Sequence, residues 1–132
     1  MNSVEGVHSS LAEYYDLLDG QLTGVLTTIG PDGPHAAPVW FVFNDGCVWV
    51  STRRATQKHR NIVRDPRVSF TIVDPANTMR YVEIRGRATV TDDPTYETRE
   101  RVVGKHGFAS GASFDPPGTQ RVSIRIEPIR IV

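Results

Sequence analysis

The sequence predicts a small antiparallel β-barrel formed by a single domain. Six stretches of the 132-residue chain alternate apolar with polar side chains or contain several β-branched or aromatic residues, and only short segments outside them have helical spacing. These stretches are 22–29, 34–43, 47–52, 67–73, 79–91 and 122–131. Because a chain of this length can bury about two-thirds of its unfolded surface, we expect one mainly β domain spanning residues 1–132.

A helix is expected before the first strand. Ser10 and Glu13 form a capping box, in which each side chain can bond the backbone amide of the other residue. Gly20 is a typical residue for ending the helix. One apolar face with helical spacing is formed by Leu11, Tyr14, Tyr15 and Leu18. We interpret the helix as a plug for one end of the barrel.

The next three strands are expected to form an antiparallel meander. The segment 30–33 (GPDG) is a strong turn between the strands at 22–29 and 34–43. The segment 44–46 (NDG) connects the second strand to the strand at 47–52, since Asn, Asp and Gly tolerate positive φ. Two tight turns predict that each strand pairs with its successor in the chain.

Positive charge is concentrated between Val48 and Phe70. Six of the 15 Lys and Arg residues lie in this stretch against one acid, although the whole chain has a formal net charge of zero. Thr56 is a plausible N-cap for a helix from Gln57 to Arg64, which should end before a proline. A basic corner just after a strand indicates an anion site, most naturally for a cofactor phosphate, with a solvated charged face as the alternative.

The second half of the chain predicts strands at 67–73 and 79–91, with Gly86 marking a bulge or bend in the latter. Asp93-Pro94 should begin a polar surface helix that runs to about His106. The loop 107–118 contains Phe108 and Phe114, which we expect to pin it to the body, a substrate lid being the alternative. Strict alternation predicts the last strand at 122–131.

Several classes of protein are disfavoured by composition. The chain has one cysteine, Cys47, which we expect to be a packing residue, and its four histidines show no ligand spacing, so we expect no metal site. A nucleic-acid partner is not expected, because no exposed aromatic series accompanies the short basic cluster. A membrane partner is not expected either, because no apolar run approaches about 20 residues. The amino terminus lacks the features of a signal peptide, so we expect a cytoplasmic protein.

The order of these elements resembles the pyridoxamine-phosphate-oxidase-like split β-barrel superfamily, and within it the small actinobacterial-type reductases that use the deazaflavin coenzyme F420. The resemblance covers nearly the whole chain. Its most specific part is the stretch 48–70, in which Lys-x-x-Asn is followed by RDPRVS. The hairpin at 30–46, the strand YVEIRGRATVTDDP and the ending RVSIRIEPIRI also match.

The resemblance implies a six-stranded antiparallel split β-barrel that forms a homodimer, with two cofactor sites at the subunit interface. It implies that the ring of the cofactor packs along Pro38, Val39, Trp40, Ser51 and Thr52. Lys58 and Thr56 would hold the phosphate, and Asn61 would support that corner. Tyr81 stands where the partner subunit reaches the cofactor. Many relatives that bind FMN have arginine directly before the lysine, whereas this chain has Gln57.

The function that this resemblance implies is an oxidoreductase that transfers hydride from reduced coenzyme F420 to a small conjugated or heteroaromatic substrate. One alternative is an FMN-dependent oxidoreductase of the pyridoxamine-phosphate-oxidase type, and another is a flavin- or deazaflavin-binding module without turnover. Arg53 or Arg54 could replace the cation missing at Gln57. No catalytic residue is singled out, since solvent, Tyr81 or His35 could deliver a proton.

Overall fold

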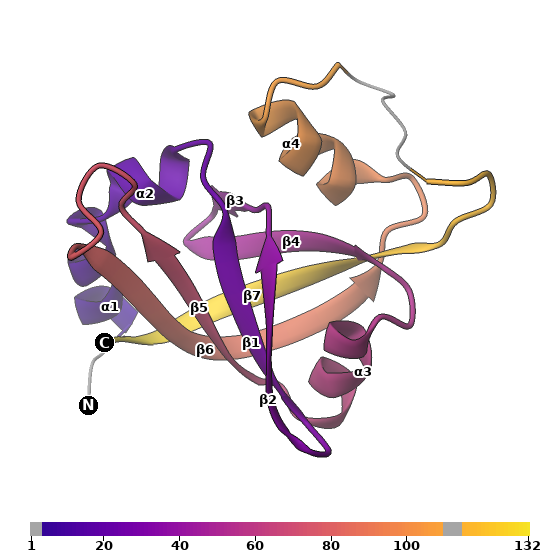
Figure 1. Ribbon diagram of the computed structural model, residues 1–132, viewed down its shortest axis with the longest axis horizontal. Coiled ribbons are helices and arrows are strands. Elements are labelled where there is room, and N and C mark those ends of the chain that lie inside the picture. Colours follow the sequence, from indigo (N-terminus) through magenta and orange to yellow (C-terminus); the bar gives the residue numbers. More distant parts are fainter. Residues whose placement is uncertain (1–3, 110–114) are drawn as a thin grey trace.

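A computed structural model of the protein describes residues 4–109 and 115–132. The described residues form one seven-stranded, wholly antiparallel sheet with the order β2-β1-β5-β6-β7-β4-β3, which curls into a barrel-like shape (Figure 1). The strands are β1 (Gly24–Gly30), β2 (Gly33–Val39), β3 (Val42–Asn44), β4 (Cys47–Arg53), β5 (Arg67–Val73), β6 (Tyr81–Asp92) and β7 (Arg121–Ile131). The helices are α1 (Val4–Ala12), α2 (Tyr15–Asp19), α3 (Gln57–Arg64) and α4 (Glu97–Lys105). The predicted mainly β, antiparallel fold is confirmed.

The predicted count of six strands is wrong, because the segment 34–43 is broken at Trp40–Phe41. Its first half, β2, pairs with β1, whereas its second half, β3, pairs with β4 at the opposite edge of the sheet. The predicted three-stranded meander is therefore wrong, although each half of the segment pairs with the strand next to it in the chain, as predicted. At the break the ring of Phe41 is fully buried and meets Phe70 edge-on, with 4.9 Å between ring centroids. Both flanking turns form as predicted, but core packing directs the chain from one edge to the other between them.

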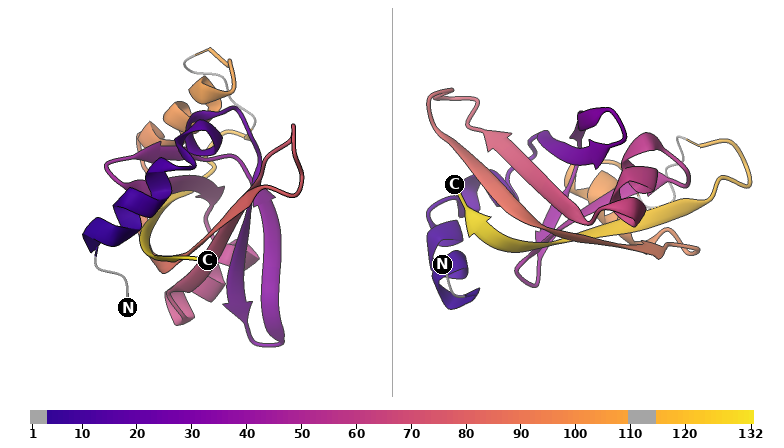
Figure 2. Two further views of the ribbon diagram at one scale, coloured as in Figure 1. Left: turned by 90° about the vertical axis from the view of Figure 1, so that its left-hand side faces the viewer. Right: turned by 90° about the horizontal axis from the view of Figure 1, so that it is seen from below.

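Helices cover the ends of the sheet (Figure 1, Figure 2). Helix α1 lies against the carboxyl end of β7, and Leu11 and Leu18 are fully buried, which agrees with the predicted plug. The prediction of one helix is wrong, because a turn at residues 13–14 separates α1 from α2 and leaves Tyr15 exposed. The predicted capping box is wrong, because α1 extends from Val4 and places Ser10 inside the helix. Val7 lies one turn before Leu11 and is also buried, so the apolar face begins earlier than Ser10.

Two predicted features of the middle of the chain are confirmed. Helix α3 and strand β5 have the predicted limits, 57–64 and 67–73. The register between β6 and β7 shifts between Arg85 and Gly86, which is the predicted bulge. A Cβ atom on Gly86 would lie 2.3 Å from the carbonyl oxygen of Glu127, so only glycine fits this close approach.

Helix α4 begins later than predicted. Asp93 caps it from outside, since its carboxylate accepts hydrogen bonds from the amides of Glu97 at 2.8 Å and Thr98 at 3.1 Å. Tyr96, with φ 58°, precedes the first helical residue in a left-handed conformation, so Pro94 is not the first residue of the helix. After α4, Phe108 contacts Trp40, as expected of a residue that pins the loop, whereas Phe114 lies outside the described residues. No described helix is both long and apolar enough to span a membrane.

Candidate functional site

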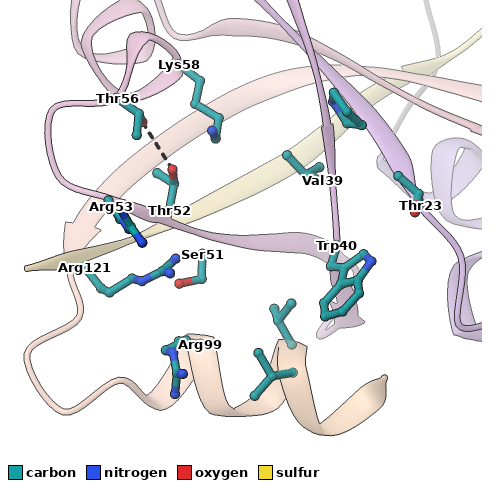
Figure 3. Close-up of a pocket in the computed structure, with 13 residues that line it drawn as sticks. Thr23, Val39, Trp40, Ser51, Thr52, Arg53, Thr56, Lys58, Arg99 and Arg121 are labelled. Carbon is teal, nitrogen blue, oxygen red and sulfur yellow. Dashed lines mark hydrogen bonds between the residues drawn. The ribbon is translucent and has the colours of Figure 1, made fainter. Parts of the chain in front are cut away.

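A cavity of about 570 Å³ lies where the end of β2, the end of β4, the start of α3 and the inner face of α4 meet (Figure 3). Of the predicted site residues, seven line this cavity: Pro38, Val39, Trp40, Ser51, Thr52, Thr56 and Lys58. The other lining residues are Thr23, Arg53, Arg99, Val102, Val103 and Arg121. The structure thus brings together the residues of β2, β4 and α3 that the sequence analysis grouped.

The break in the segment 34–43 and the sharp return after β4 create this arrangement. Trp40 stands at the break and points toward the cavity from the end of β2 (Figure 3). Helix α3 begins four residues after β4 ends, so the chain folds back and brings Lys58 over Thr52. The hydroxyl oxygens of Thr52 and Thr56 lie 3.2 Å apart and share a hydrogen bond. Thr56 is the N-cap residue of α3, as predicted, but its side chain makes no capping hydrogen bond to the helix.

Among the cationic side chains that line the cavity, Lys58 is the one whose positive charge is least offset by neighbouring acids. Its side chain is half-buried and makes no hydrogen bond or ion pair within residues 4–109 and 115–132. Burial lowers the pKa of the Lys58 ammonium, and the positive charge of Arg121 lowers it further. An anion bound here would offset both effects.

Three arginines extend this basic wall and meet around Asp115. Arg121 Nε donates to Asp115 Oδ2 at 2.8 Å, and Arg53 Nε donates to Asp115 Oδ1 at 3.0 Å. Arg99 Nε lies 4.0 Å from the same carboxylate, and Arg99 also pairs with Glu100. The hydrogen bond from Arg121 is the main reason that the pKa of the Asp115 carboxyl is lowered. Positive charge therefore exceeds negative charge along this side of the cavity.

Ser51 carries a buried polar atom that the described residues leave unsatisfied. The residue lines the cavity, and its Oγ has no hydrogen-bond partner within residues 4–109 and 115–132. A buried hydroxyl without a partner costs about 1–3 kcal/mol, and a polar ligand group would remove that cost. Ser51 and Lys58 together indicate a ligand that carries both hydrogen-bonding groups and negative charge.

The opposite side of the cavity is apolar. Val39 and Trp40, at the end of β2, form one wall of this apolar part, and Val102 and Val103 of α4 form the other wall. A flat ring can be held between such surfaces, with polar groups at one end fixing its orientation. The cavity therefore suits an elongated ligand with an aromatic part and an anionic part.

Three predicted site residues do not line this cavity. The amide of Asn61 is buried and donates to Thr28 Oγ1 at 2.9 Å, while its oxygen accepts from Gln57 Nε2 at 2.7 Å. Gln57 and Asn61 thus attach α3 to β1 and face a separate hollow beside the β1–β2 turn. Tyr81 lies at the start of β6 and is 52% exposed.

Sequence reasoning missed the contribution of α4 and of the start of β7. Arg99, Val102 and Val103 have i, i+3 and i+4 spacing, which places them on one helical face and could have marked α4 as a cavity wall. Arg121 faces Arg53 in the β4–β7 register, a pairing that requires knowledge of the sheet order. Of the two arginines predicted as substitutes for a cation at Gln57, Arg53 lines the cavity, whereas Arg54 pairs with Asp92 outside it.

The fold and the cavity describe a small split β-barrel with a cavity that is basic on one side and apolar on the other. The family model described as pyridoxamine 5'-phosphate oxidase matches residues 11–132, and the chain belongs to this family. A search of curated proteins found no match.

Solved structures with the same fold include one named as an F420 reductase, which is 30% identical over 89% of this chain and 94% of its own, with a TM-score of 0.77. A conserved hypothetical protein of Mycobacterium tuberculosis is 32% identical, and the match covers 91% of this chain and 81% of that protein with a TM-score of 0.73. General Stress Protein 26 of Bacillus anthracis is 26% identical over 91% of this chain and 89% of its own, with a TM-score of 0.66.

Proposed function

We propose that the protein is an oxidoreductase that binds reduced coenzyme F420 in this cavity and reduces a small conjugated or heteroaromatic substrate. The observation that carries the proposal is the joining of a basic wall at Lys58 to an apolar slot at Val39 and Trp40 in one cavity of about 570 Å³. The 30% identity to an F420 reductase over most of both chains supports the choice of cofactor.

The residues of the cavity fit such a cofactor. Lys58 would hold a phosphate, with the hydroxyl of Thr56 and the first amides of α3, which have no partners within a helix, as further donors. Ser51 Oγ, which has no partner in the described chain, would bond a polar atom of the ring or its side chain. When bound, the reduced deazaflavin supplies the hydride for the reduction.

The chain's own contribution is to bind and orient. Val39 and Trp40 on one side and Val102 and Val103 on the other would fix a flat ring and exclude water from its faces. Neither His35 nor Tyr81 lines the cavity of this chain, so within one subunit solvent is the available proton source. We therefore assign no acid or base among the cavity residues.

An FMN-dependent oxidoreductase is the second candidate, favoured by the description of the matching family as pyridoxamine 5'-phosphate oxidase. The side chain of Gln57 faces Asn61 and Arg60, not the cavity, so position 57 supplies no cation to a phosphate at Lys58. The surplus of positive charge instead comes from Arg53, Arg99 and Arg121, which suits a ligand with more negative charge than one phosphate.

Equilibrium titration of the purified protein with coenzyme F420 and, separately, with FMN tests the proposal. We expect F420 to bind more tightly. Failure of F420 to bind at high micromolar concentration would contradict the proposal, and a stoichiometric FMN copurifying with the protein would favour the second candidate. Oxidation of excess reduced F420 with quinone and nitroaromatic substrates, followed over many turnovers, then separates an enzyme from a module that only binds its cofactor.

A further inference from the structure

The break between β2 and β3 is held from two sides by the end of α4. Lys105 Nζ donates to the carbonyl oxygen of Phe41 at 3.2 Å and to that of Leu18 at 2.9 Å, and it lies 3.9 Å from the centroid of the Phe41 ring. The imidazole of His106 stacks on the indole of Trp40 with 4.0 Å between centroids and 8° between planes. Two consecutive residues at the end of the helix thus hold two consecutive residues at the break.

Trp40 depends on such contacts for its orientation. The indole lines the cavity, and Trp40 is 38% exposed. Its Nε1–H group donates no hydrogen bond to any of the described residues. Its ring neighbours are His106, nearly parallel to it, and Phe108, at 5.8 Å and tilted by 30°. The parallel imidazole is therefore the contact that fixes the plane of the indole.

We propose that His106 is a positioning residue for the cofactor cavity, holding Trp40 as a fixed wall by stacking while Lys105 anchors the backbone of the break. The inference deepens the proposed function, since it concerns the same cavity. Helix α4 then contributes to the cavity in two ways. Val102 and Val103 form one wall directly, and Lys105 and His106 at its end orient Trp40 in the opposite wall.

The surroundings of His106 favour the neutral imidazole. His106 Nε2 is buried without a hydrogen-bond partner among the described residues, so a proton there would add an unpaired buried donor. Burial lowers the pKa of His106 below its usual 6.5, and the adjacent Lys105 lowers it further. Trp40, Phe41 and Phe108 are uncharged, and the acid that acts on the neighbouring Lys105 is Asp19 of α2. The ordering of Trp40 should therefore be complete above about pH 6.5 and be lost as the pH falls through the lowered pKa of His106.

The fluorescence of Trp40 can be used to follow how the ordering of its indole depends on pH. The chain has two tryptophans, and Trp49 lies on β4 outside the cavity, where it donates to the carbonyl oxygen of Asn44. In a Trp49→Phe background, Trp40 emission is followed from about pH 8 to pH 5, the range in which imidazole titrates. His106→Ala removes the ring, His106→Phe keeps a ring that cannot be protonated, and Arg101→Ala is a matched change on an exposed part of α4.

In the Trp49→Phe protein we expect an emission change with a midpoint below pH 6.5, because protonation of His106 releases the stack and changes the surroundings of the indole. His106→Phe and His106→Ala should abolish that change, and Arg101→Ala should keep it. His106→Ala should weaken F420 binding at neutral pH about two- to tenfold, the worth of one aromatic pair, whereas His106→Phe should stay within about twofold of the parent.

Equal binding by the Ala and Phe variants, or an emission step that survives without His106, would show that His106 does not position Trp40. The two proposals fail separately. If the parent protein binds neither F420 nor FMN, the proposed function is wrong, but the emission step needs no ligand and still decides whether His106 orders Trp40.

Discussion

At the residue scale, Lys58 is the group whose surroundings most favour an anion. We expect Lys58→Ala to weaken cofactor affinity by about 1.5 kcal/mol or more, the lower end for a hydrogen bond to a charged group. The reason is that the ammonium is half-buried and makes no ion pair within the described residues, so its charge is available to a ligand. Isothermal titration of F420 into both proteins measures the difference.

Arg64→Ala is the matched control for that change. It removes the same charge from the same helix, but Arg64 lies on the exposed side and bonds the carbonyl oxygen of Ile29 outside the cavity. A general electrostatic effect would weaken binding in both variants. Unchanged affinity in Lys58→Ala would mean that the phosphate binds elsewhere, for example at Arg53 and Arg121.

The part of the site that could be predicted from the sequence is the part formed by residues that are close to one another along the chain. Ser51, Thr52, Thr56 and Lys58 follow one another through the end of a strand and the start of a helix, so their proximity needs no tertiary knowledge. Helical spacing alone could also have excluded Gln57 and Asn61, since positions i and i+4 share a face that Lys58, about 100° further round, does not. Arg99 and Arg121 depend on how α4 and β7 pack, which local pattern does not contain.

At the element scale, the attachment of α3 to β1 depends on one buried hydrogen bond. Asn61→Ala should lower the free energy of unfolding by about 1–3 kcal/mol, because it leaves the Thr28 hydroxyl buried without a donor. Urea unfolding measures this cost. The double variant with Thr28→Val removes both partners and should recover part of the loss; a cost that is simply additive would show that the bond between the two side chains is not its source.

The β6–β7 bulge depends on the absence of a side chain at Gly86. Gly86→Ala should destabilise the protein by about 1–3 kcal/mol, as overpacking does, since its Cβ would lie 2.3 Å from a backbone oxygen that cannot move freely. Gly104→Ala is the matched control, because no atom lies within 4 Å of its Cβ in helix α4. That change should stabilise by about 0.5–1 kcal/mol. Thermal unfolding of both variants checks the opposite signs.

Elements were predictable where their signals are local. The turns at 30–33 and 44–46, the proline that ends α3 and the bulge at Gly86 each follow from the conformational preferences of the residues themselves. The break at Trp40–Phe41 was not predictable in this way. The residues on both sides of it, Val39 to Phe43, are all apolar and typical of a strand, and only the burial of Phe41 against the distant Phe70 divides the segment into β2 and β3.

At the scale of the whole molecule, one face of the sheet carries exposed apolar side chains. Val73 and Tyr81 are paired across β5 and β6, and Val25 is paired with Thr71, two residues from Val73, so the three side chains share a face. Their exposed fractions are 37% for Val25, 46% for Val73 and 52% for Tyr81. Contiguous exposed apolar surface of this kind marks interaction sites.

We therefore expect a homodimer that buries this face, in which Tyr81 reaches the cavity of the other subunit. Light scattering should give twice the monomer mass, and Val25→Arg should shift the protein toward monomer by burying an unpaired charge at the interface. Val63→Arg, at a position that is 70% exposed on α3, should leave the dimer intact.

Tyr81→Ala should weaken F420 binding even though Tyr81 does not line the cavity of its own chain. A protein that is monomeric at high micromolar concentration and binds F420 fully would refute this assembly, because the cavity of one subunit would then be sufficient.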